Sequence, residues 1–491
     1  MKLITNRPEF YNDICEEIRL FLPRAEILMD EGGDVLAENE DNPSLSLMLT
    51  ADGCFHTQAV FDSEGRSFSY EHDTPLRNED PIIERRYAKR CMKTAAFRAM
   101  RQAFPDKLIP WGSLTGIRPT RLLRELVETS GYDEAMRLMR EEFDVNESKL
   151  RLAEEINSVQ GPIIKSAKPN EFGVYIGIPF CRTRCLYCSF ASQLRTKKTD
   201  MAAYLSALHR DIELGSAMAK AHGLTARSFY MGGGTPTILT ADELDALLDK
   251  ICACYDTARR EFTVEAGRPD TITPEKLRVM KAHGVTRVSV NPQTMCDKTL
   301  RLVGRDHTSA DIIACYNEVK KLGFDSVNMD LIAGLPNETE KDFARSLEAV
   351  ESLSPDCLTV HTLAIKRASR LHERMDEYEL PSVETVERMV DLGRETAARM
   401  GMKPYYMYRQ KYMAGNLENV GYSKADSICI YNIDMMEDGM SILAHGAGAM
   451  TKRVWAEGGR IERVPNNKDI ATYIERIEET NEERERLFEL I

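Results

Sequence analysis

The sequence predicts an α/β fold whose main domain is an open, partial barrel of six (β/α) units. Six apolar, β-prone runs recur at βαβ spacing and are each followed by a helical pattern, which is typical of a parallel sheet with helices outside it. Glycines and polar residues follow these runs directly, at the strand ends that form the active face of a barrel. We expect the six strands at 173–178, 227–231, 261–266, 286–291, 325–332 and 357–363.

The chain is long enough to hold more than this one domain. It has 491 residues, of which 43% are hydrophobic, so it can bury several cores. Strand patterns around a glycine-containing hairpin turn at 51–53 give way to helical patterns from residue 81 onward, which predicts an α+β amino-terminal domain. The stretch 161–170 carries turn residues and is predicted to be a linker. The expected division is an amino-terminal domain at 1–165, the partial barrel at 170–370 and a carboxyl-terminal α+β extension at 371–491.

The loop after the first predicted barrel strand holds the most informative residues. Cys181, Cys185 and Cys188 stand there in a C-x3-C-x2-C spacing, so three thiolates can converge on one side of the backbone. A cubane 4Fe–4S cluster takes four ligands, and no fourth cysteine lies nearby, so one iron would stay open for an exogenous ligand. A structural zinc ion is the alternative, but it prefers two C-x2-C pairs or added histidines, which this loop lacks.

The other nine cysteines show no framework spacing. They are scattered and mostly lie in apolar patterns, so we interpret them as reduced residues of the cores. Cys252 and Cys254 lie on a helical pattern on which their thiols diverge, so we do not expect them to bind a metal.

Composition narrows the classes of partner. The formal net charge of −13 argues against non-specific binding to nucleic acid or to a membrane surface, since both need a basic face. No run of about 18 apolar residues and no signal-peptide core occurs, so we expect a cytoplasmic protein without membrane insertion. We also expect a monomer.

A longer string around the cysteines carries a family resemblance. From Tyr175 to Phe190 it reads Tyr-x-x-Ile-Pro-Phe-Cys-x3-Cys-x-Tyr-Cys-x-Phe. This string resembles the signature of the radical S-adenosylmethionine enzymes and, more specifically, of the oxygen-independent coproporphyrinogen III oxidase (coproporphyrinogen dehydrogenase) family in its HemZ-type branch. The resemblance covers about residues 170–450. It implies a 4Fe–4S cluster on the three cysteines, and S-adenosylmethionine whose amino and carboxylate groups bind the open iron.

Polar residues and glycines at the strand ends are the candidate binding residues. Three glycines, 232–234, end the second strand and let a ligand approach the backbone, although a tight turn is the alternative. Glu265 ends the third strand, and Asp330 lies inside the apolar fifth strand, where a carboxylate needs a partner or a ligand. By resemblance the cofactor contacts are Tyr175, Tyr187, Gly233 and Glu265 for the first S-adenosylmethionine, and Gly234, Thr235, Gln293, Arg305 and Asp330 for a second nucleotide pocket. No catalytic residue is expected beyond these cofactor ligands.

Four features lie at or after the end of the barrel pattern. His361 follows the sixth strand, either as a site residue or as a satisfied polar residue. The aromatic and cationic stretch 404–412 is either the floor of a pocket for a flat ring system or a tyrosine-rich strand. The small-residue stretch 441–449 resembles the family's Gly-x-Gly-Ala element. The charged stretch 469–491 is predicted to be one helix that covers the surface.

The resemblance implies an oxidoreductase of porphyrin and haem biosynthesis that works anaerobically. A 5'-deoxyadenosyl radical would abstract hydrogen from propionate side chains of coproporphyrinogen III, and loss of carbon dioxide and one electron would leave the vinyl groups of protoporphyrinogen IX. The alternatives are a haem-binding chaperone of the HemW type and a radical S-adenosylmethionine enzyme that acts on another tetrapyrrole. The implied partners are a tetrapyrrole and an electron donor such as flavodoxin or ferredoxin. Two departures bear on the substrate: Gly177 replaces a histidine, and residues 1–165 are unlike the short extension of the HemN oxidases.

Overall fold

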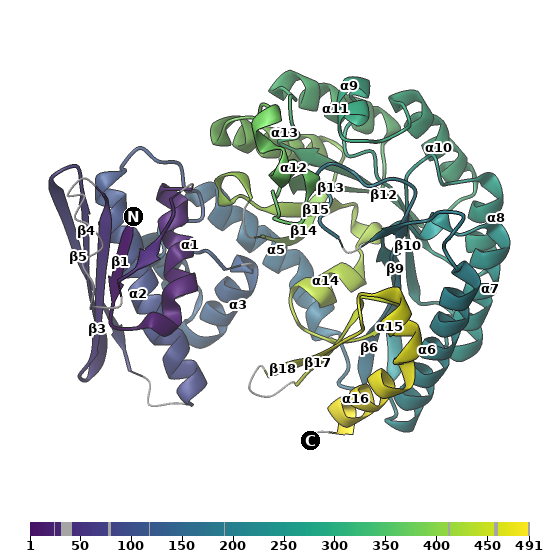
Figure 1. Cartoon of the computed structure of the whole chain (residues 1–491), viewed down its shortest axis with the longest axis horizontal. Coiled ribbons are helices and arrows are strands. Elements are labelled where there is room, and N and C mark those ends of the chain that lie inside the picture. The colour runs from purple at the N-terminus through teal and green to yellow at the C-terminus, as the bar shows by residue number, and fades with distance from the viewer. Residues whose placement is uncertain are drawn as a thin grey trace. The chain divides into compact units, whose positions relative to one another are not determined.

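The computed structural model describes residues 1–23, 25–30, 42–76, 80–116, 118–190, 192–410, 413–455 and 460–489. The chain divides into two compact units, and each is described by itself (Figure 1). The first unit comprises Met1–Ala153 with Gly415–Leu417, and the second comprises Glu154–Ala414 with Glu418–Ile491. The domain boundaries expected at residues 165, 170 and 370 stay predictions.

The first unit is an α+β fold built on one mixed sheet. Its strands run in the order β2-β1-β3-β4-β5, with β1 parallel to β2 and β3 and an antiparallel meander from β3 to β5. The predicted hairpin is therefore confirmed. Apolar side chains of α1 and α2 pack with those of the sheet into one core. The elements are β1 Lys2–Thr5, α1 Tyr11–Phe21, β2 Leu28–Met29, β3 Ser44–Ala51, β4 Cys54–Ser63, β5 Arg66–Pro75, α2 Pro81–Ala103, α3 Pro119–Ser130 and α4 Tyr132–Arg137.

The first part of the predicted linker is wrong, because helix α5 runs from Glu147 to Lys165 and contains Pro162. A proline inside a helix removes one backbone donor. Two tertiary contacts offset this loss. Ile163 and Ile164 pack against a core cluster, and the Arg227 guanidinium donates to the Ile163 carbonyl at 2.9 Å near the helix end.

A single eleven-stranded sheet organises the second unit, in the order β14-β15-β13-β12-β11-β10-β9-β6-β16-β17-β18. The six predicted strands are all present and are parallel to one another. The order has two free ends, so the sheet is open, as expected for a partial barrel. The six strands are β6 Glu171–Ile178, β9 Thr225–Gly233, β10 Glu261–Gly267, β11 Arg287–Val290, β12 Ser326–Ala333 and β13 Cys357–Thr362.

Strands that follow residue 370 extend this same sheet at both ends. Strand β16 lies parallel beside β6, so a seventh parallel strand joins the six that the pattern predicts. The other four are antiparallel to their neighbours, β15 and β14 at one end and β17 and β18 at the other. Their bounds are β14 Lys403–Tyr408, β15 Asn419–Ser423, β16 Ser441–His445, β17 Met450–Val454 and β18 Ile461–Pro465.

Helices connect the parallel strands, and Figure 1 shows α7, α8 and α10 on the outer side of the curved sheet. Several begin at a threonine whose side chain accepts from the first turn, as at Thr240, Thr308 and Thr339, which satisfies backbone donors that a helix start leaves free. Within the described ranges, no helix has the length and apolar character needed to cross a membrane. The helices are α6 Met201–Ala221, α7 Ala241–Cys254, α8 Pro274–Ala282, α9 Asp297–Leu302, α10 Ser309–Lys321, α11 Glu340–Leu353, α12 Arg370–Glu373, α13 Val383–Arg399 and α14 Ile430–Met436.

The last charged stretch forms two helices, α15 Ile470–Glu475 and α16 Ile477–Glu489, and not one surface helix. Arg484 of α16 is 1% exposed and donates to the Asp211 carboxylate of α6 at 2.6 Å. It also donates to the Ala444 carbonyl of β16 at 2.7 Å. The prediction that this stretch only covers the surface is therefore wrong for α16, because the charge of Arg484 is buried and paired with Asp211.

Candidate active site

The cysteine loop, residues 181–190, begins where the first parallel strand ends. After β6, the short strand β7 (Phe180–Cys181) pairs with β8 (Gln193–Leu194), which closes the loop. The Cys188 amide donates to the Cys185 carbonyl at 3.1 Å, so the second and third cysteines share a tight turn. All three thiols are partly exposed and free of disulfides. They can therefore receive a cofactor.

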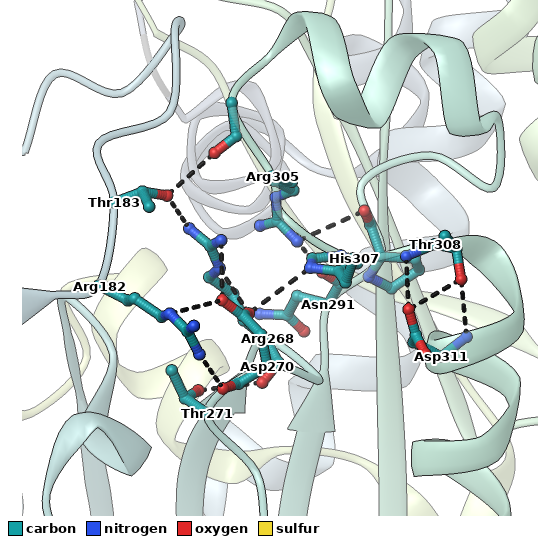
Figure 2. Close-up of polar contacts among 12 residues, drawn as sticks. Arg182, Thr183, Arg268, Asp270, Thr271, Asn291, Arg305, His307, Thr308 and Asp311 are labelled. Atoms are coloured by element: carbon teal, nitrogen blue, oxygen red, sulfur yellow. Dashed lines mark hydrogen bonds and ion pairs between the residues drawn. The ribbon is translucent and has the colours of Figure 1, made fainter.

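A polar network fixes the first half of this loop from behind (Figure 2). The Thr183 hydroxyl donates to the Gly304 carbonyl at 2.9 Å and accepts from Arg268. Arg268 in turn forms an ion pair with the Asp270 carboxylate through two hydrogen bonds. The backbone carbonyl of Asp270 also accepts a hydrogen bond from the guanidinium of Arg182, a residue of the loop. The residues between Cys181 and Cys185 are thus tied to the segment after β10 and to the segment after helix α9.

Arg305 connects the second half of the loop to β11. Its guanidinium donates to the Asn291 carbonyl at 2.6 Å. It also hydrogen-bonds the Tyr187 hydroxyl and the Cys185 thiol, and these groups hold the pKa of Arg305 above its ordinary value although burial acts to lower it. Arg305 is 6% exposed. Its contacts in the structure are therefore with the loop, and its expected role at a second nucleotide stays a prediction.

The three glycines at and after the end of β9 lie against neighbouring protein atoms and not in open space: Gly232 faces Glu265, and Gly233 and Gly234 face the backbone at the end of β6. A Cβ at Gly234 would stand 2.4 Å from the Phe180 carbonyl oxygen, and the Gly234 amide donates to the Ile178 carbonyl at 2.8 Å. The protein's own backbone therefore requires glycine here. The next residue, Thr235, points its hydroxyl at the Cys181 sulfur, 3.6 Å away. Both residues border the proposed cluster site.

A continuous row of half-buried polar side chains crosses one face of the sheet. The rings of Tyr175 and Tyr230 stack with centroids 6.4 Å apart, and the Tyr230 hydroxyl donates to Glu265. Asp330 and His361 follow, with 3.7 Å between carboxylate and imidazole, and the Tyr408 hydroxyl lies 3.4 Å from the same imidazole. We call these six residues the polar row: Tyr175, Tyr230, Glu265, Asp330, His361 and Tyr408.

The two carboxyl groups of the polar row are held in different states. Burial raises the pKa of Glu265 to about 7, and the nearby charge of Asp330 adds to this effect. Burial acts to raise the pKa of Asp330 as well, but its hydrogen bond to His361, together with that of Asn328, lowers the pKa below its ordinary value. Asp330 is therefore ionised near neutral pH, whereas Glu265 can gain or lose a proton there.

The backbone of Gln293 bonds to strand β12, including the polar-row residue Asp330, and among the described residues its backbone hydrogen bonds do not reach the cysteine loop. Its φ is +66°, which is uncommon for a residue other than glycine. Its amide donates to the Asp330 carbonyl, and its carbonyl accepts from the Ile332 amide, each at 2.9 Å. The backbone of Gln293 thus prolongs the pairing of β11 with β12.

Sequence reasoning missed two tyrosines beside the site, Tyr230 and Tyr431. Their rings stack with centroids 4.6 Å apart. Tyr230 stands two residues before the glycines 232–234, and that position near a strand end was the available signal. Of the aromatic stretch 404–412, Tyr405 and Tyr406 are buried and Tyr408 belongs to the polar row, while Lys411 and Tyr412 lie outside the described residues.

A separate cleft of about 640 Å³ is lined by Arg182, Asp270, His307 and Lys321 among others. It contains none of the three loop cysteines and no residue of the polar row. We therefore do not assign it to the cofactors.

The residues present fit a 4Fe–4S cluster. Each cysteine of such a cluster binds a different iron, so the sulfurs stand apart by the width of the cluster. A zinc site instead needs all its sulfurs within about 2.3 Å of one ion. Among the residues that the structure describes, no three His, Cys, Asp or Glu side chains are grouped to hold a single metal ion. Burial raises the pKa of Cys188, and the neighbouring Cys185 and Cys181 add to this effect, so the three sulfurs share one environment.

Comparison with known proteins places this site in a family context. The model of the radical SAM superfamily matches residues 175–350. Over 388 residues the chain is 39% identical to the oxygen-independent coproporphyrinogen-III oxidase-like protein HemZ of Bacillus subtilis, covering 78% of this chain and 77% of that protein.

Two further similarities are more partial. Over 235 residues the chain is 31% identical to the heme chaperone HemW of Bacillus subtilis, covering 47% of this chain and 61% of that protein. The solved structure of coproporphyrinogen III oxidase (HemN) from Escherichia coli aligns with a TM-score of 0.53 and 23% identity, covering 66% of this chain and 73% of that one. This structure supports the fold.

Proposed function

Because this chain belongs to the radical S-adenosylmethionine superfamily, and within it to the coproporphyrinogen oxidase-like family of HemZ, HemN and HemW, we propose that it is an oxidoreductase acting on tetrapyrroles. Its cofactors are a 4Fe–4S cluster and S-adenosylmethionine. The proposed reaction converts propionate side chains of coproporphyrinogen III into vinyl groups and gives protoporphyrinogen IX.

The position of the polar row beside the cysteine loop carries this proposal. When bound, the cluster would supply the electron for cleavage of S-adenosylmethionine, and each propionate would give a hydrogen atom to the 5'-deoxyadenosyl group, release carbon dioxide and pass one electron to an external acceptor. Cys181, Cys185 and Cys188 would hold the cluster, while Arg305 and Thr183 keep their loop in place.

The polar row would hold the two small molecules. An ionised Asp330 suits ribose hydroxyls or an ammonium group, and Glu265 accepts both from Tyr230 and from the Gly233 amide at the end of β9. Tyr175 and Tyr408 present flat rings at the two ends of the row, next to which a pyrrole ring can pack. These roles are proposals for the individual residues.

The similarity to the heme chaperone HemW supports a second candidate function, binding of haem without turnover. By motif resemblance, Gln293, Arg305 and Asp330 belong to the second nucleotide pocket that the chaperones have only in part. We therefore favour the enzyme.

One experiment separates the two candidates. Anaerobically reconstituted protein is incubated with dithionite, S-adenosylmethionine and coproporphyrinogen III, and vinyl products and 5'-deoxyadenosine are followed by mass spectrometry. The enzyme should form protoporphyrinogen IX together with 5'-deoxyadenosine. Stoichiometric haem binding without any vinyl product would instead assign the chaperone function.

Cysteine variants serve as the internal controls of that experiment. Cys185→Ala should lose both iron and product, because the residue would be a cluster ligand. Cys254→Ala, at the end of α7, should keep both. If Cys254 were equally necessary, the assignment of the cluster to the loop would be wrong.

A further inference from the structure

Two segments of this acidic chain carry only positive charge. Residues 179–199 contain Arg182, Arg184, Arg195, Lys197 and Lys198 and no aspartate or glutamate. Residues 363–372 contain Lys366, Arg367 and Arg370, again without a carboxylate. The formal net charge of the whole chain is −13, so two segments of this composition stand out.

Both segments are bonded to the cysteine loop. The Arg195 amide donates to the Cys181 carbonyl at 3.0 Å, which places the residues that follow it next to the first cysteine. The Arg184 guanidinium donates to the Ala368 carbonyl at 2.7 Å, and the Leu371 amide donates to the Leu186 carbonyl at 2.9 Å. The positive charges therefore flank the proposed cluster on two sides.

Four of these cations are turned to solvent and have no acidic partner. Lys197, Lys198, Arg367 and Arg370 are exposed. In the part of the chain that the structure describes, no carboxylate lies within ion-pair distance of any of the four, whereas Arg195 pairs with Glu243. An exposed charge without an internal partner is available to a ligand. We call these four residues the cationic rim.

Two exposed apolar side chains lie in the same segment as Lys197 and Lys198. Phe190 is 69% exposed and Leu194 is 44% exposed. Leu194 pairs with Cys181 across β7 and β8, and Phe190 stands two residues after Cys188. Large apolar side chains at the centre of a polar rim are typical of protein–protein interfaces.

From these observations we propose that the cationic rim with Phe190 and Leu194 is the docking surface for a small acidic electron-carrier protein. The inference rests on the proposed function, because the cluster needs one electron from outside for each cleavage of S-adenosylmethionine. A carrier bound there would lie against the loop that holds the cluster, and electrostatic attraction would guide its approach. The reduced carrier would transfer one electron to the cluster, so the carrier would be oxidised by one electron and the cluster reduced by one electron.

A protein fits this surface better than a nucleic acid does. A nucleic acid needs a long basic track that follows its phosphates, while an overall acidic chain repels it elsewhere. The four cations here occur with two exposed apolar side chains close to the cysteine loop instead, and such a combination matches an acidic protein surface with apolar side chains of its own.

The test measures carrier binding and cluster reduction separately. The rim variant carries Lys197→Glu, Lys198→Glu, Arg367→Glu and Arg370→Glu in the full-length reconstituted protein. The probes are a reduced acidic flavodoxin and a reduced acidic 2Fe–2S ferredoxin. Calorimetry gives the Kd, and stopped-flow absorbance without any tetrapyrrole gives the rate of cluster reduction. We expect the rim variant to raise the Kd and slow the reduction by tenfold or more, and both effects to shrink between about 50 mM and about 300 mM salt.

A matched variant controls for net charge. The control variant changes the formal net charge by the same amount at four other exposed cations of the same unit. Its substitutions are Lys220→Glu, Arg259→Glu, Arg278→Glu and Lys403→Glu. This control should bind both carriers as the native protein does. Dithionite should reduce the rim variant at the native rate, since it needs no docking surface.

Three results would overturn the docking surface: an unchanged Kd in the rim variant, an equal loss in the control variant, or tight binding of a single-stranded RNA that the rim variant loses. Failure of the proposed function is distinct, because it would appear as absent vinyl products with dithionite while carrier binding and cluster reduction stay intact. If one carrier alone binds, that carrier is the class of partner.

Discussion

The role of Arg305 differs most between the prediction from sequence and the contacts in the structure. The family resemblance implies that Arg305 contacts a second nucleotide. In the structure its planar guanidinium bridges the Asn291 carbonyl of β11's end and two groups of the cysteine loop, Tyr187 and Cys185. Arg305 is thus a positioning residue for the loop, whatever ligand it also meets.

Arg305→Lys should slow cleavage of S-adenosylmethionine roughly tenfold. A lysine cannot bridge three acceptors at once, and loss of a charge-assisted bond costs about 1.5–3 kcal/mol. The measurements are the rate of 5'-deoxyadenosine formation and the electron paramagnetic resonance spectrum of the reduced cluster. A positioning role predicts that the spectrum changes with the rate. Arg301→Lys, an exposed residue on α9, is the control, and a native rate and spectrum in Arg305→Lys would exclude the role.

Glu265 gives the site a pH dependence near neutrality. Its pKa is raised to about 7 by burial, so the carboxyl is largely protonated at pH 6 and ionised at pH 8. An ionised carboxylate attracts cationic S-adenosylmethionine, and a protonated one does not. Affinity should therefore fall as the pH drops from about 8 to about 6, by up to about tenfold.

Equilibrium binding of S-adenosylmethionine across that range tests the role of Glu265. The variant Glu265→Gln should lose the pH dependence and keep its iron, because the residue is not a ligand of the cluster. A pH dependence that persists in Glu265→Gln would assign it to another group.

At the scale of elements, the antiparallel strands β14 and β15 form one end of the sheet, and a single glycine in β15, Gly421, makes room for a tyrosine ring of β14. A Cβ on Gly421 would stand 1.8 Å from the Tyr406 ring, so the ring lies flat across this residue. Tyr406 also contacts the Tyr405 ring, with centroids 4.7 Å apart, and lies parallel to Tyr408 of the polar row. One missing side chain therefore allows three tyrosines to pack.

Gly421→Ala should destabilise the protein by about 1–3 kcal/mol, because overpacking forces the Tyr406 ring away. The thermal unfolding midpoint should fall, and binding of S-adenosylmethionine should weaken as Tyr408 shifts. Gly439→Ala is the matched control, since nothing lies within 4 Å of a Cβ there. Equal midpoints for the two variants would show that the ring moves without cost.

At the scale of the whole second unit, the carboxyl-terminal helix α16 is tied to the sheet by a buried charge pair. Arg484 and Asp211 are each 1% exposed, and the His445 imidazole of β16 donates to the same carboxylate at 2.9 Å. Burial acts to raise the pKa of Asp211, but Arg484 and His445 hold it well below its ordinary range. The pair joins helices α6 and α16 and strand β16.

Arg484→Met should destabilise the second unit by about 3–5 kcal/mol, because it leaves a buried carboxylate without its main partner. Chemical denaturation provides the measurement. Arg486→Met, an exposed position on the same helix, should cost little. The double variant with Asp211→Asn should be more stable than Arg484→Met alone, and a less stable double variant would contradict this explanation.

The sequence alone determined the six parallel strands, the hairpin of the first unit and the cysteine loop. These features depend on residues close together in the chain, such as the alternation of strand and helix patterns or the spacing of Cys181, Cys185 and Cys188. Local periodicity and local spacing are sufficient to specify them.

Tertiary structure alone decided which distant residues meet. Strand β16 lies beside β6, Arg484 reaches Asp211, and Tyr408 joins a row that begins at Tyr175. Gly234 is required by the Phe180 carbonyl of another strand. Such contacts follow from burial and packing between segments up to several hundred residues apart, and no pattern within one segment encodes them, because each side chain's environment is set by its neighbours in space.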